Sequence, residues 1–232
     1  MITVKIAGIP IGIDNRFDYV RSISVDYLTD EEPCFTVNAT DAEIDAEGNM
    51  SDEVYSKNYL ESIVVFRKIA ERLPQYDAIV FHSAILVKDG KAYAFTAKSG
   101  TGKTTHTRLW LSRFGDAVHY LNGDKPVIRL IDGTAYAFGT PWRGKEGYGA
   151  NESAPLAAIA LLERDEKNSA EIIDSNGGVI RLMTQIHIPK DPACAALAMR
   201  IADRIISSVR FVELKCNLDA EAADVAANAM LN

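Results

Sequence analysis

The feature that most constrains this chain is a glycine-rich loop set between an apolar segment and a helix-forming segment. Residues 97–104 read AKSGTGKT and directly follow the apolar run Ala92–Thr96. Gly100 and Gly102 allow the backbone to curl so that several N–H groups point at one anion. A helix expected over Thr105–Arg113 would add the positive end of its dipole. The spacing is that of a phosphate-binding loop, with Ala97 in place of the usual first glycine.

A hairpin pattern leads into this loop. The apolar run Ala84–Val87 is followed by the dipeptide Asp89-Gly90 and then by Ala92–Thr96. Asp-Gly between two strands favours a type I′ turn, in which both central residues have positive φ. We therefore predict that the strand entering the loop runs antiparallel to the strand before it.

The rest of the chain alternates strand and helix patterns, which predicts a mixed α/β fold. Strands are expected at Thr3–Ile6, Ile23–Tyr27, Cys34–Val37, Val118–Leu121, Val127–Ile131, Ala135–Phe138, Leu156–Leu162 and Val209–Leu214. Helices are expected over 52–73, ended by Pro74, and from the capping residues Asp191 and Asp219. The acidic segment Asp41–Glu53 and the glycine-rich segment Gly139–Ser153 are expected to be loops.

Composition limits the size and the partners of the protein. With 232 residues, 47% of them hydrophobic, the chain can bury one core with a small appendage. The formal net charge is −7, and the acidic excess lies in the first third. We expect an acidic N-terminal α+β extension over residues 1–75 and a core with C-terminal helices over 76–232. A nucleic-acid-binding protein would normally show a basic patch, so no nucleic-acid partner is expected.

Cysteine usage and hydropathy indicate a cytoplasmic protein. Cys34, Cys194 and Cys216 are far apart and form no CxxC pattern, which is typical of reduced thiols. The N-terminus lacks the build of a signal peptide. The longest apolar run, Ala154–Leu162, contains a proline and is too short to span a bilayer, so no membrane partner is expected.

The segment FHSAILVKDGKAYAFTAKSGTGKTTHTRLW resembles the core of the HPr kinase and PEP carboxykinase superfamily. The likeness consists of a histidine before a hairpin, the hairpin itself, and S-G-x-G-K-[ST]. It extends over roughly Asp77–Asn168 and includes NGDKPVIRL and GTPWRGKEG, which resemble small HPr-kinase-like proteins. It implies a PEP carboxykinase-like P-loop fold with a mixed, largely antiparallel sheet, flanking helices and a small N-terminal α+β extension.

The resemblance implies an ATP-dependent kinase that uses Mg²⁺. The nucleotide-binding residues would be Ser99, Gly100, Thr101, Gly102, Lys103, Thr104 and Thr105. Thr104 and Asp124 are the candidate metal ligands. Thr105 is more like PEP carboxykinase, but the chain is short and lacks the extended motifs of that enzyme.

Four residues are candidates for catalysis. His82 aligns with the family histidine, and Asp124 stands where the family carries a carboxylate pair, although Gly123 occupies one of those two positions. Asp124 would be either a base or a metal ligand. Arg143 and Lys145 are candidate cations for the transition state. The alternative readings are a core histidine, a strand-end turn aspartate and solvated loop charges.

Several other residues have a structural and a functional reading. His106 and His119 are expected to be structural, and His187 has no local support for a role. Trp142 is either a ring that stacks on a ligand or a buried loop anchor. Glu163 and Arg164 end a strand that could line the site, but pairing with other charges is the simpler expectation, and Asn151 is a weaker candidate contact.

Three functions fit the pattern. The first is a kinase acting on a serine hydroxyl of a protein or peptide. The second is a kinase for a small hydroxylated metabolite such as free serine. The third, suggested by Gly123, is an ATP-binding regulatory module without transfer activity. A homo-oligomer is expected by analogy only.

Overall fold

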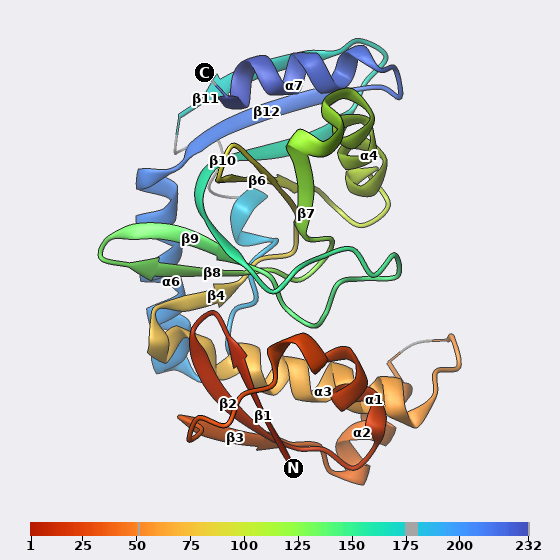
Figure 1. Cartoon of the computed structure of the whole chain (residues 1–232), viewed down its shortest axis with the longest axis vertical. Helices are drawn as coiled ribbons and strands as arrows, with labels where there is room; N and C mark the ends of the chain where they lie inside the picture. Colours follow the sequence, from red (N-terminus) through yellow and green to blue (C-terminus); the bar gives the residue numbers. More distant parts are fainter. Residues whose placement is uncertain (51, 175–180, 232) are drawn as a thin grey trace.

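The computed structural model describes residues 1–50, 52–174 and 181–231. The molecule is elongated, with a small sheet and its helices at the end that holds the N-terminus and a large mixed sheet at the end that holds the C-terminus (Figure 1). Within the described ranges, no helix combines the length and apolar character needed to cross a membrane.

A three-stranded sheet opens the chain. Its order is β1-β2-β3, with β1 and β2 antiparallel and β2 and β3 parallel. The strands are β1 (Ile2–Ile6), β2 (Ile9–Asp14) and β3 (Phe35–Asn38). The strands predicted at Thr3–Ile6 and Cys34–Val37 are therefore confirmed. Sequence reasoning missed β2, because the proline and glycine in IPIGID are uncommon inside strands.

Helices pack on this sheet and fill the N-terminal end of the molecule. They are α1 (Asp18–Ile23), η1 (Val25–Tyr27), α2 (Asp41–Gly48), α3 (Lys57–Arg72) and η2 (Leu73–Tyr76). The helix predicted over 52–73 is α3, which starts later and ends before Pro74. Its apolar side, including Leu60, Val65 and Ile69, is buried in a core shared with β1, β2 and β3.

Two predictions for this end were wrong. The strand predicted at Ile23–Tyr27 is the end of α1 followed by the short helix η1, which buries Tyr27. The loop predicted over Asp41–Glu53 contains α2, and residue 51 lies outside the described residues. A capping box forms α2: the Glu43 N–H donates to Thr40 Oγ1 at 3.3 Å, and the Thr40 N–H donates to Glu43 Oε2 at 2.8 Å.

The described strands of the second part join in a nine-stranded curled sheet. The order is β4-β8-β9-β10-β6-β5-β7, with β12 beside β10 and β11 beside β12. The strands are β4 (Ala78–Val80), β5 (Ala84–Lys88), β6 (Lys91–Thr96), β7 (Val118–Asn122), β8 (Val127–Ile131), β9 (Thr134–Phe138), β10 (Ser153–Arg164), β11 (Ser169–Ile173) and β12 (Arg210–Cys216). Of the pairings within this sheet, β10 with β6 and β10 with β12 are parallel, and the others are antiparallel.

Both predicted hairpins are confirmed. Asp89 and Gly90 have φ of 51° and 72°, and Asp132 and Gly133 have φ of 48° and 82°. These values fit type I′ turns. The strand that enters the glycine-rich loop, β6, is antiparallel to its predecessor β5, as predicted.

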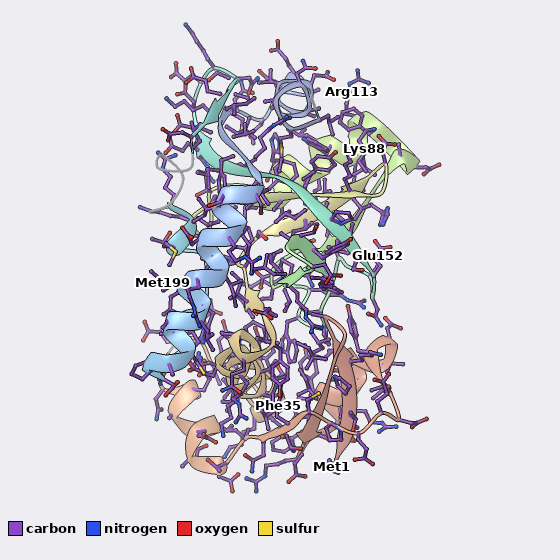
Figure 2. The ribbon with its side chains drawn as sticks, turned by 90° about the vertical axis from the view of Figure 1, so that its left-hand side faces the viewer. Met1, Phe35, Lys88, Arg113, Glu152 and Met199 are labelled. Carbon is purple, nitrogen blue, oxygen red and sulfur yellow. The ribbon has the colours of Figure 1, made fainter. Side chains whose placement is uncertain are left out.

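Helices cover both faces of the large sheet. The elements are α4 (Lys103–Phe114), η3 (Gly115–Ala117), α6 (Pro192–Ser208) and α7 (Glu221–Leu231). On β10, Ala158 and Ala160 face the core formed with α4 and α7, whereas Ile159 and Leu161 face the core formed with α6. Figure 2 shows α6, which carries the labelled Met199, running along one side of the molecule. Because β10 is buried on both faces, its residues Leu156–Leu162 form a continuous apolar run.

Candidate functional site

The sheet topology brings four chain segments to one edge. Because β6 and β7 both run antiparallel to β5, both end where β5 begins. The strands β10 and β12 run parallel to β6 and end at the same edge. The loop after β6, His82 before β5, Asp124 after β7 and Arg164 at the end of β10 therefore lie along one edge of the sheet.

Both glycines of the loop over residues 97–104 have positive φ. Gly100 has φ of 78° and Gly102 has φ of 120°, a region that side chains rarely adopt. A Cβ at either position would meet nothing within 4 Å, so backbone conformation rather than space requires glycine. Helix α4 begins at Lys103, and its N-cap, Gly102, makes no side-chain cap hydrogen bond. An uncapped helix start on such a curl is suited to an anion.

Lys103 crosses the loop that precedes it. Its Nζ donates to the carbonyl oxygen of Ala97 at 3.1 Å. Burial lowers the pKa of Lys103, and the nearby Asp124 carboxylate opposes that effect. Thr104 stands in the first turn of α4, where its carbonyl accepts a hydrogen bond from Thr107 Oγ1 at 3.0 Å. Of the other loop candidates, Ser99 and Thr105 are exposed and Thr101 is half-buried.

His82 and Asp124 form a pair beside the loop. His82 Nε2 lies 3.3 Å from Asp124 Oδ1, and His82 Nδ1 lies 3.2 Å from Gln185 Oε1. Gln185 donates its amide hydrogen to Thr184 Oγ1, which turns its oxygen toward the ring. Both ring nitrogens of His82 therefore face acceptor oxygens.

Backbone contacts hold Asp124 in place. Asn122 Oδ1 accepts hydrogen bonds from the N–H of Asp124 at 2.9 Å and of Lys125 at 2.8 Å. Burial raises the pKa of Asp124, but the hydrogen bond from His82 and the positive charges of Lys125 and Lys103 outweigh burial, so that its pKa lies below the ordinary value. Asp124 is consequently a carboxylate at neutral pH.

Position 123 has no room for a side chain. A Cβ at Gly123 would lie 2.9 Å from the carbonyl oxygen of Arg143 and 3.3 Å from that of Tyr148. The Gly123 N–H donates to the Tyr148 carbonyl at 2.9 Å, so the loop between β9 and β10 packs directly on the backbone of Gly123. No side chain fits there without moving backbone.

In the loop between β9 and β10, the candidate cation Arg143 binds the N-terminal third instead of Asp124. Arg143 Nη2 binds Asp26 Oδ2 at 2.9 Å, and its guanidinium lies over the Tyr27 ring, in the N-terminal third. Lys145 is exposed. The part of the loop that reaches Asp124 is Gly144, where a Cβ would lie 2.9 Å from Asp124 Cβ. Catalytic roles for Arg143 and Lys145 stay predictions.

Arg164 holds the glycine-rich loop from the side of β10. Its Nε donates to the Thr101 carbonyl at 2.9 Å, and its Nη2 donates to the Gly100 carbonyl at 2.6 Å. Because the two polar ends of a trans peptide point in opposite directions, the Gly102 N–H points away from Arg164. Among the described residues Arg164 has no ion-pair partner, contrary to expectation, whereas Glu163 does pair with Arg181.

Two further side chains have structural partners. Trp142 Nε1 donates to the Ser62 carbonyl at 3.1 Å, and its ring packs on Phe66, which supports the loop-anchor reading. Asn151 donates to the Asp26 carbonyl at 2.6 Å and so contacts the N-terminal third. These bonds tie the loop between β9 and β10 to the N-terminal third.

The remaining histidines lie in different surroundings. His119 pairs with Glu152, and His187 Nε2 lies 3.0 Å from Glu71 Oε1. His106, on α4, is 3% exposed, packs on the Phe95 ring and has no hydrogen-bond partner for either ring nitrogen within the described residues. Burial lowers the pKa of His106 to about 4, so its ring is neutral at pH 7.

Sequence reasoning missed Gln185 and Asn122 as parts of the site. Gln185 is distant in the sequence and has no motif of its own, so only the fold reveals that it contacts His82. Asn122 adjoins Asp124, and an asparagine at a strand end is a signal for local backbone bonding that could have been used.

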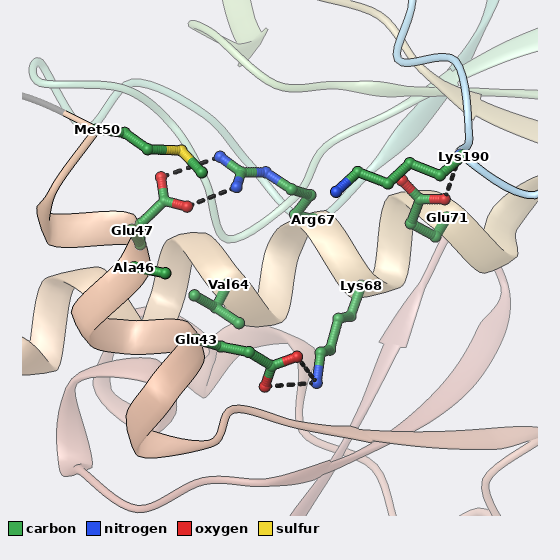
Figure 3. A pocket seen from close by; sticks show the side chains of 9 residues that line it. All are labelled: Glu43, Ala46, Glu47, Met50, Val64, Arg67, Lys68, Glu71 and Lys190. Atoms are coloured by element: carbon green, nitrogen blue, oxygen red, sulfur yellow. Dashed lines mark hydrogen bonds and ion pairs between the residues drawn. The ribbon is translucent and has the colours of Figure 1, made fainter.

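A separate hollow of about 380 Å³ lies between α2 and α3 (Figure 3). Four of its charged side chains form two ion pairs: Lys68 binds Glu43 at 2.7 Å, and Arg67 Nη2 binds Glu47 Oε1 at 2.9 Å. It lies among helices of the N-terminal third, away from the sheet edge described above. We regard it as a feature of helix packing.

Neither a known protein family nor a curated protein matches this sequence. Among solved structures, the chain is similar to the HPr(Ser) kinase/phosphatase from Coxiella burnetii, with 10% sequence identity and a TM-score of 0.36. The match covers 66% of this chain and 96% of that chain. A likeness this distant carries no information about activity.

Proposed function

We propose that this protein is an ATP-dependent phosphotransferase that acts on a hydroxyl group, with a serine of a protein or peptide as the acceptor. One observation carries the proposal. A loop with two glycines at positive φ and an uncapped helix start shares a sheet edge with the Asp124–His82 pair. The first feature is suited to a polyphosphate, and the second is suited to a metal ion or a proton.

The residues present fit ATP and Mg²⁺. The curl at Gly100 and Gly102 and the start of α4 would hold phosphate oxygens, and the Lys103 ammonium would neutralise them. Mg²⁺ prefers oxygen ligands and is usually held by one or two protein groups together with phosphates. The Thr104 hydroxyl and the Asp124 carboxylate would supply those groups.

The contacts of Asp124 and its lowered pKa favour one of its two candidate roles within this proposal. A carboxylate that binds protons weakly is a poor general base but a good cation ligand. We therefore assign Asp124 to the metal and His82 to orienting that carboxylate, because both ring nitrogens of His82 already face Asp124 and Gln185. In the reaction the acceptor oxygen forms a bond to the γ-phosphorus, the bond from that phosphorus to the bridging oxygen breaks, ADP leaves, and the hydroxyl proton passes to solvent. Positioning and charge neutralisation account for most of such catalysis.

Labelled ATP with Mg²⁺ and a panel of serine peptides, whole proteins and free serine tests the proposal. Lys103→Ala should weaken ATP binding about tenfold or more, because a charge-assisted contact to phosphate is lost. Asp124→Asn should slow labelling about 100-fold or more while ATP still binds. Lys91→Ala, at the opposite end of β6, is the matched control for a lost lysine. The proposal is wrong if Lys103→Ala leaves ATP affinity unchanged.

The site also gives a specific reason for a second candidate, an ATP-binding module without transfer activity. The backbone of the loop between β9 and β10 fills the space beside Gly123. The site therefore holds one carboxylate where the resembling family has two. ATP binding without any Mg²⁺-dependent labelled product would favour this candidate. The chemical identity of a labelled product would separate a protein acceptor from free serine.

A further inference from the structure

One face of α3 lies against the segment that carries Asp124. Tyr59 and Phe66 stand about two turns apart on this helix and so share a face. The Lys125 ammonium lies 6.0 Å from the centre of the Phe66 ring and 3.6 Å from Asp124 Oδ2. The N-terminal third therefore contributes an aromatic face to the surroundings of the candidate site.

Tyr59 belongs to a group of three aromatic residues, Tyr19, Tyr55 and Tyr59, which we call the tyrosine cluster. The Tyr59 ring centroid lies 5.2 Å from that of Tyr55 and 6.1 Å from that of Tyr19. Tyr19 and Tyr59 are each 37% exposed. In Figure 1, α1 and the start of α3 lie on the side of the molecule toward which the loop between β9 and β10 extends. The tyrosine cluster thus presents ring surface that a partner can contact.

Carboxylates accompany the tyrosine cluster. Glu53 Oε2 accepts a hydrogen bond from the Tyr55 hydroxyl, and the exposed Asp18 adjoins Tyr19 at the start of α1. Aromatic rings and carboxylates together attract cations, through cation–π and charge interactions. The same face of α3 already holds the Lys125 ammonium toward its other end. The acidic excess of the first third also indicates a cationic partner.

Tyr59 lies within electrostatic reach of Asp124. Burial raises the pKa of Tyr59, and Tyr19 and the carboxylates of Asp124 and Glu53 raise it further. Such effects fade beyond about 10 Å in ordinary salt. An extended chain covers about 3.3 Å per residue, so about three residues would span the distance between the Tyr59 and Asp124 side chains.

We propose that the tyrosine cluster binds a lysine or arginine side chain of the acceptor peptide, within about three residues of the serine that receives the phosphoryl group. The inference rests on the function proposed above and selects a peptide over free serine as the acceptor. The tyrosine rings and the Glu53 carboxylate would hold the cation. The serine hydroxyl would then lie beside Asp124, at the end of β7.

A set of matched peptides tests this assignment on the full chain. Each peptide carries one serine in an alanine-glycine background, with either arginine or glutamine at one of the positions within three residues of the serine. With Mg²⁺ and labelled ATP, at least one arginine peptide should show a kcat/KM about fivefold to tenfold higher than its glutamine partner, mainly through a lower KM. Raising the salt concentration should reduce the difference.

Variants of Tyr59 separate a binding role from a structural one. Tyr59→Leu should lower kcat/KM for the arginine peptide to about the level of its glutamine partner and leave the Kd for ATP unchanged, because leucine offers no π face. Tyr59→Phe should keep the preference for arginine, since an aromatic ring remains. The control for a lost tyrosine is Tyr136→Leu, at a half-buried position on β9, which should show the wild-type preference.

The two proposals fail in distinguishable ways. If no peptide, whole protein or free serine is labelled, the proposed function is wrong and the docking assignment falls with it. If peptides are labelled but arginine gives no advantage at any position, or if Tyr59→Leu keeps the advantage, the phosphotransferase stands and the docking assignment is wrong. Labelling of free serine or whole proteins, but of none of the peptides, would also overturn the docking assignment.

Discussion

Asp124 contacts or lies near most of the other residues of the candidate site. Asp124 contacts His82 and Lys125, and Gly144 packs against its Cβ. Its carboxylate also lies close enough to Lys103 to raise the pKa of that lysine. Burial alone would favour its neutral form, but three positive or hydrogen-bonding neighbours favour the charged form. The charge of Asp124 is therefore part of the stability of the fold as well as of the proposed chemistry.

This linkage predicts a pH dependence of stability. The folded-state pKa of Asp124 lies below the ordinary value of 3.8, so its contribution is present above that value and is lost as pH falls through the folded-state pKa. At pH 7, Asp124→Asn should lower the free energy of unfolding by about 1–2 kcal/mol. The difference from wild type should shrink toward pH 3 in urea titrations. Asp203→Asn, at an exposed position on α6, is the control, and an equal difference at both pH values would contradict the linkage.

Gly123 gives a second prediction at the residue scale. Gly123→Asp would place a second carboxylate next to Asp124 in the sequence, but its Cβ would lie 2.9 Å from a backbone carbonyl oxygen. We expect a loss of about 1–3 kcal/mol in unfolding free energy, because backbone must move. Gly48→Ala on α2 is the comparison, since its Cβ would meet only the flexible end of Leu60. Equal stability of Gly123→Asp and wild type would show that the backbone of the loop between β9 and β10 can move aside at little cost in free energy.

At the scale of elements, the glycine-rich loop is held from the side by β10. Arg164 binds two consecutive carbonyls of the loop, and this orientation turns the Gly102 N–H the other way. Such an arrangement prepares the loop for an anion before the anion arrives. Preorganisation of this kind lowers the cost of binding.

The prediction is that Arg164→Ala weakens tripolyphosphate binding about tenfold with little change in melting temperature. Arg164→Lys should not restore affinity, because one ammonium cannot copy the two-nitrogen contact of a guanidinium. Faster amide hydrogen exchange in the loop of both variants would support the mechanism. Full rescue by lysine would indicate that positive charge alone matters.

At the scale of the whole molecule, the N-terminal third and the large sheet share buried contacts. Val80 and Val127 of the large sheet belong to the same core as Val4 and Val65. Trp142 bonds to Ser62 across the same junction. The boundary predicted at residue 75 stays a prediction, and these contacts indicate that the two parts stabilise each other.

A single unfolding transition is therefore expected. Trp142 reports on the junction and Trp110 on the core under α4 and α7. In urea, the fluorescence midpoints of the two single-tryptophan variants, Trp110→Phe and Trp142→Phe, should each match the circular dichroism midpoint of the same variant. An earlier fluorescence transition in the variant that retains Trp142 would mean that the N-terminal third unfolds separately.

Local chemistry determined much of this protein. The two Asp-Gly turns, the positive φ of Gly100 and Gly102, and the cap at Asp191 all follow from interactions among residues a few positions apart. The same chemistry could have predicted α2, because Thr40 and Glu43 stand at capping-box spacing.

Only the tertiary structure decided which side chains meet. Gln185 contacts His82, Asp26 forms an ion pair with Arg143, and Arg164 binds the loop over residues 97–104. Each contact forms because the fold brings together segments that are distant in the sequence. The walls of a cavity beside residues 101–102 of the loop likewise come from three separate elements, α4, β10 and β12. Side-chain direction at such places depends on long-range packing, which short-range sequence patterns do not encode.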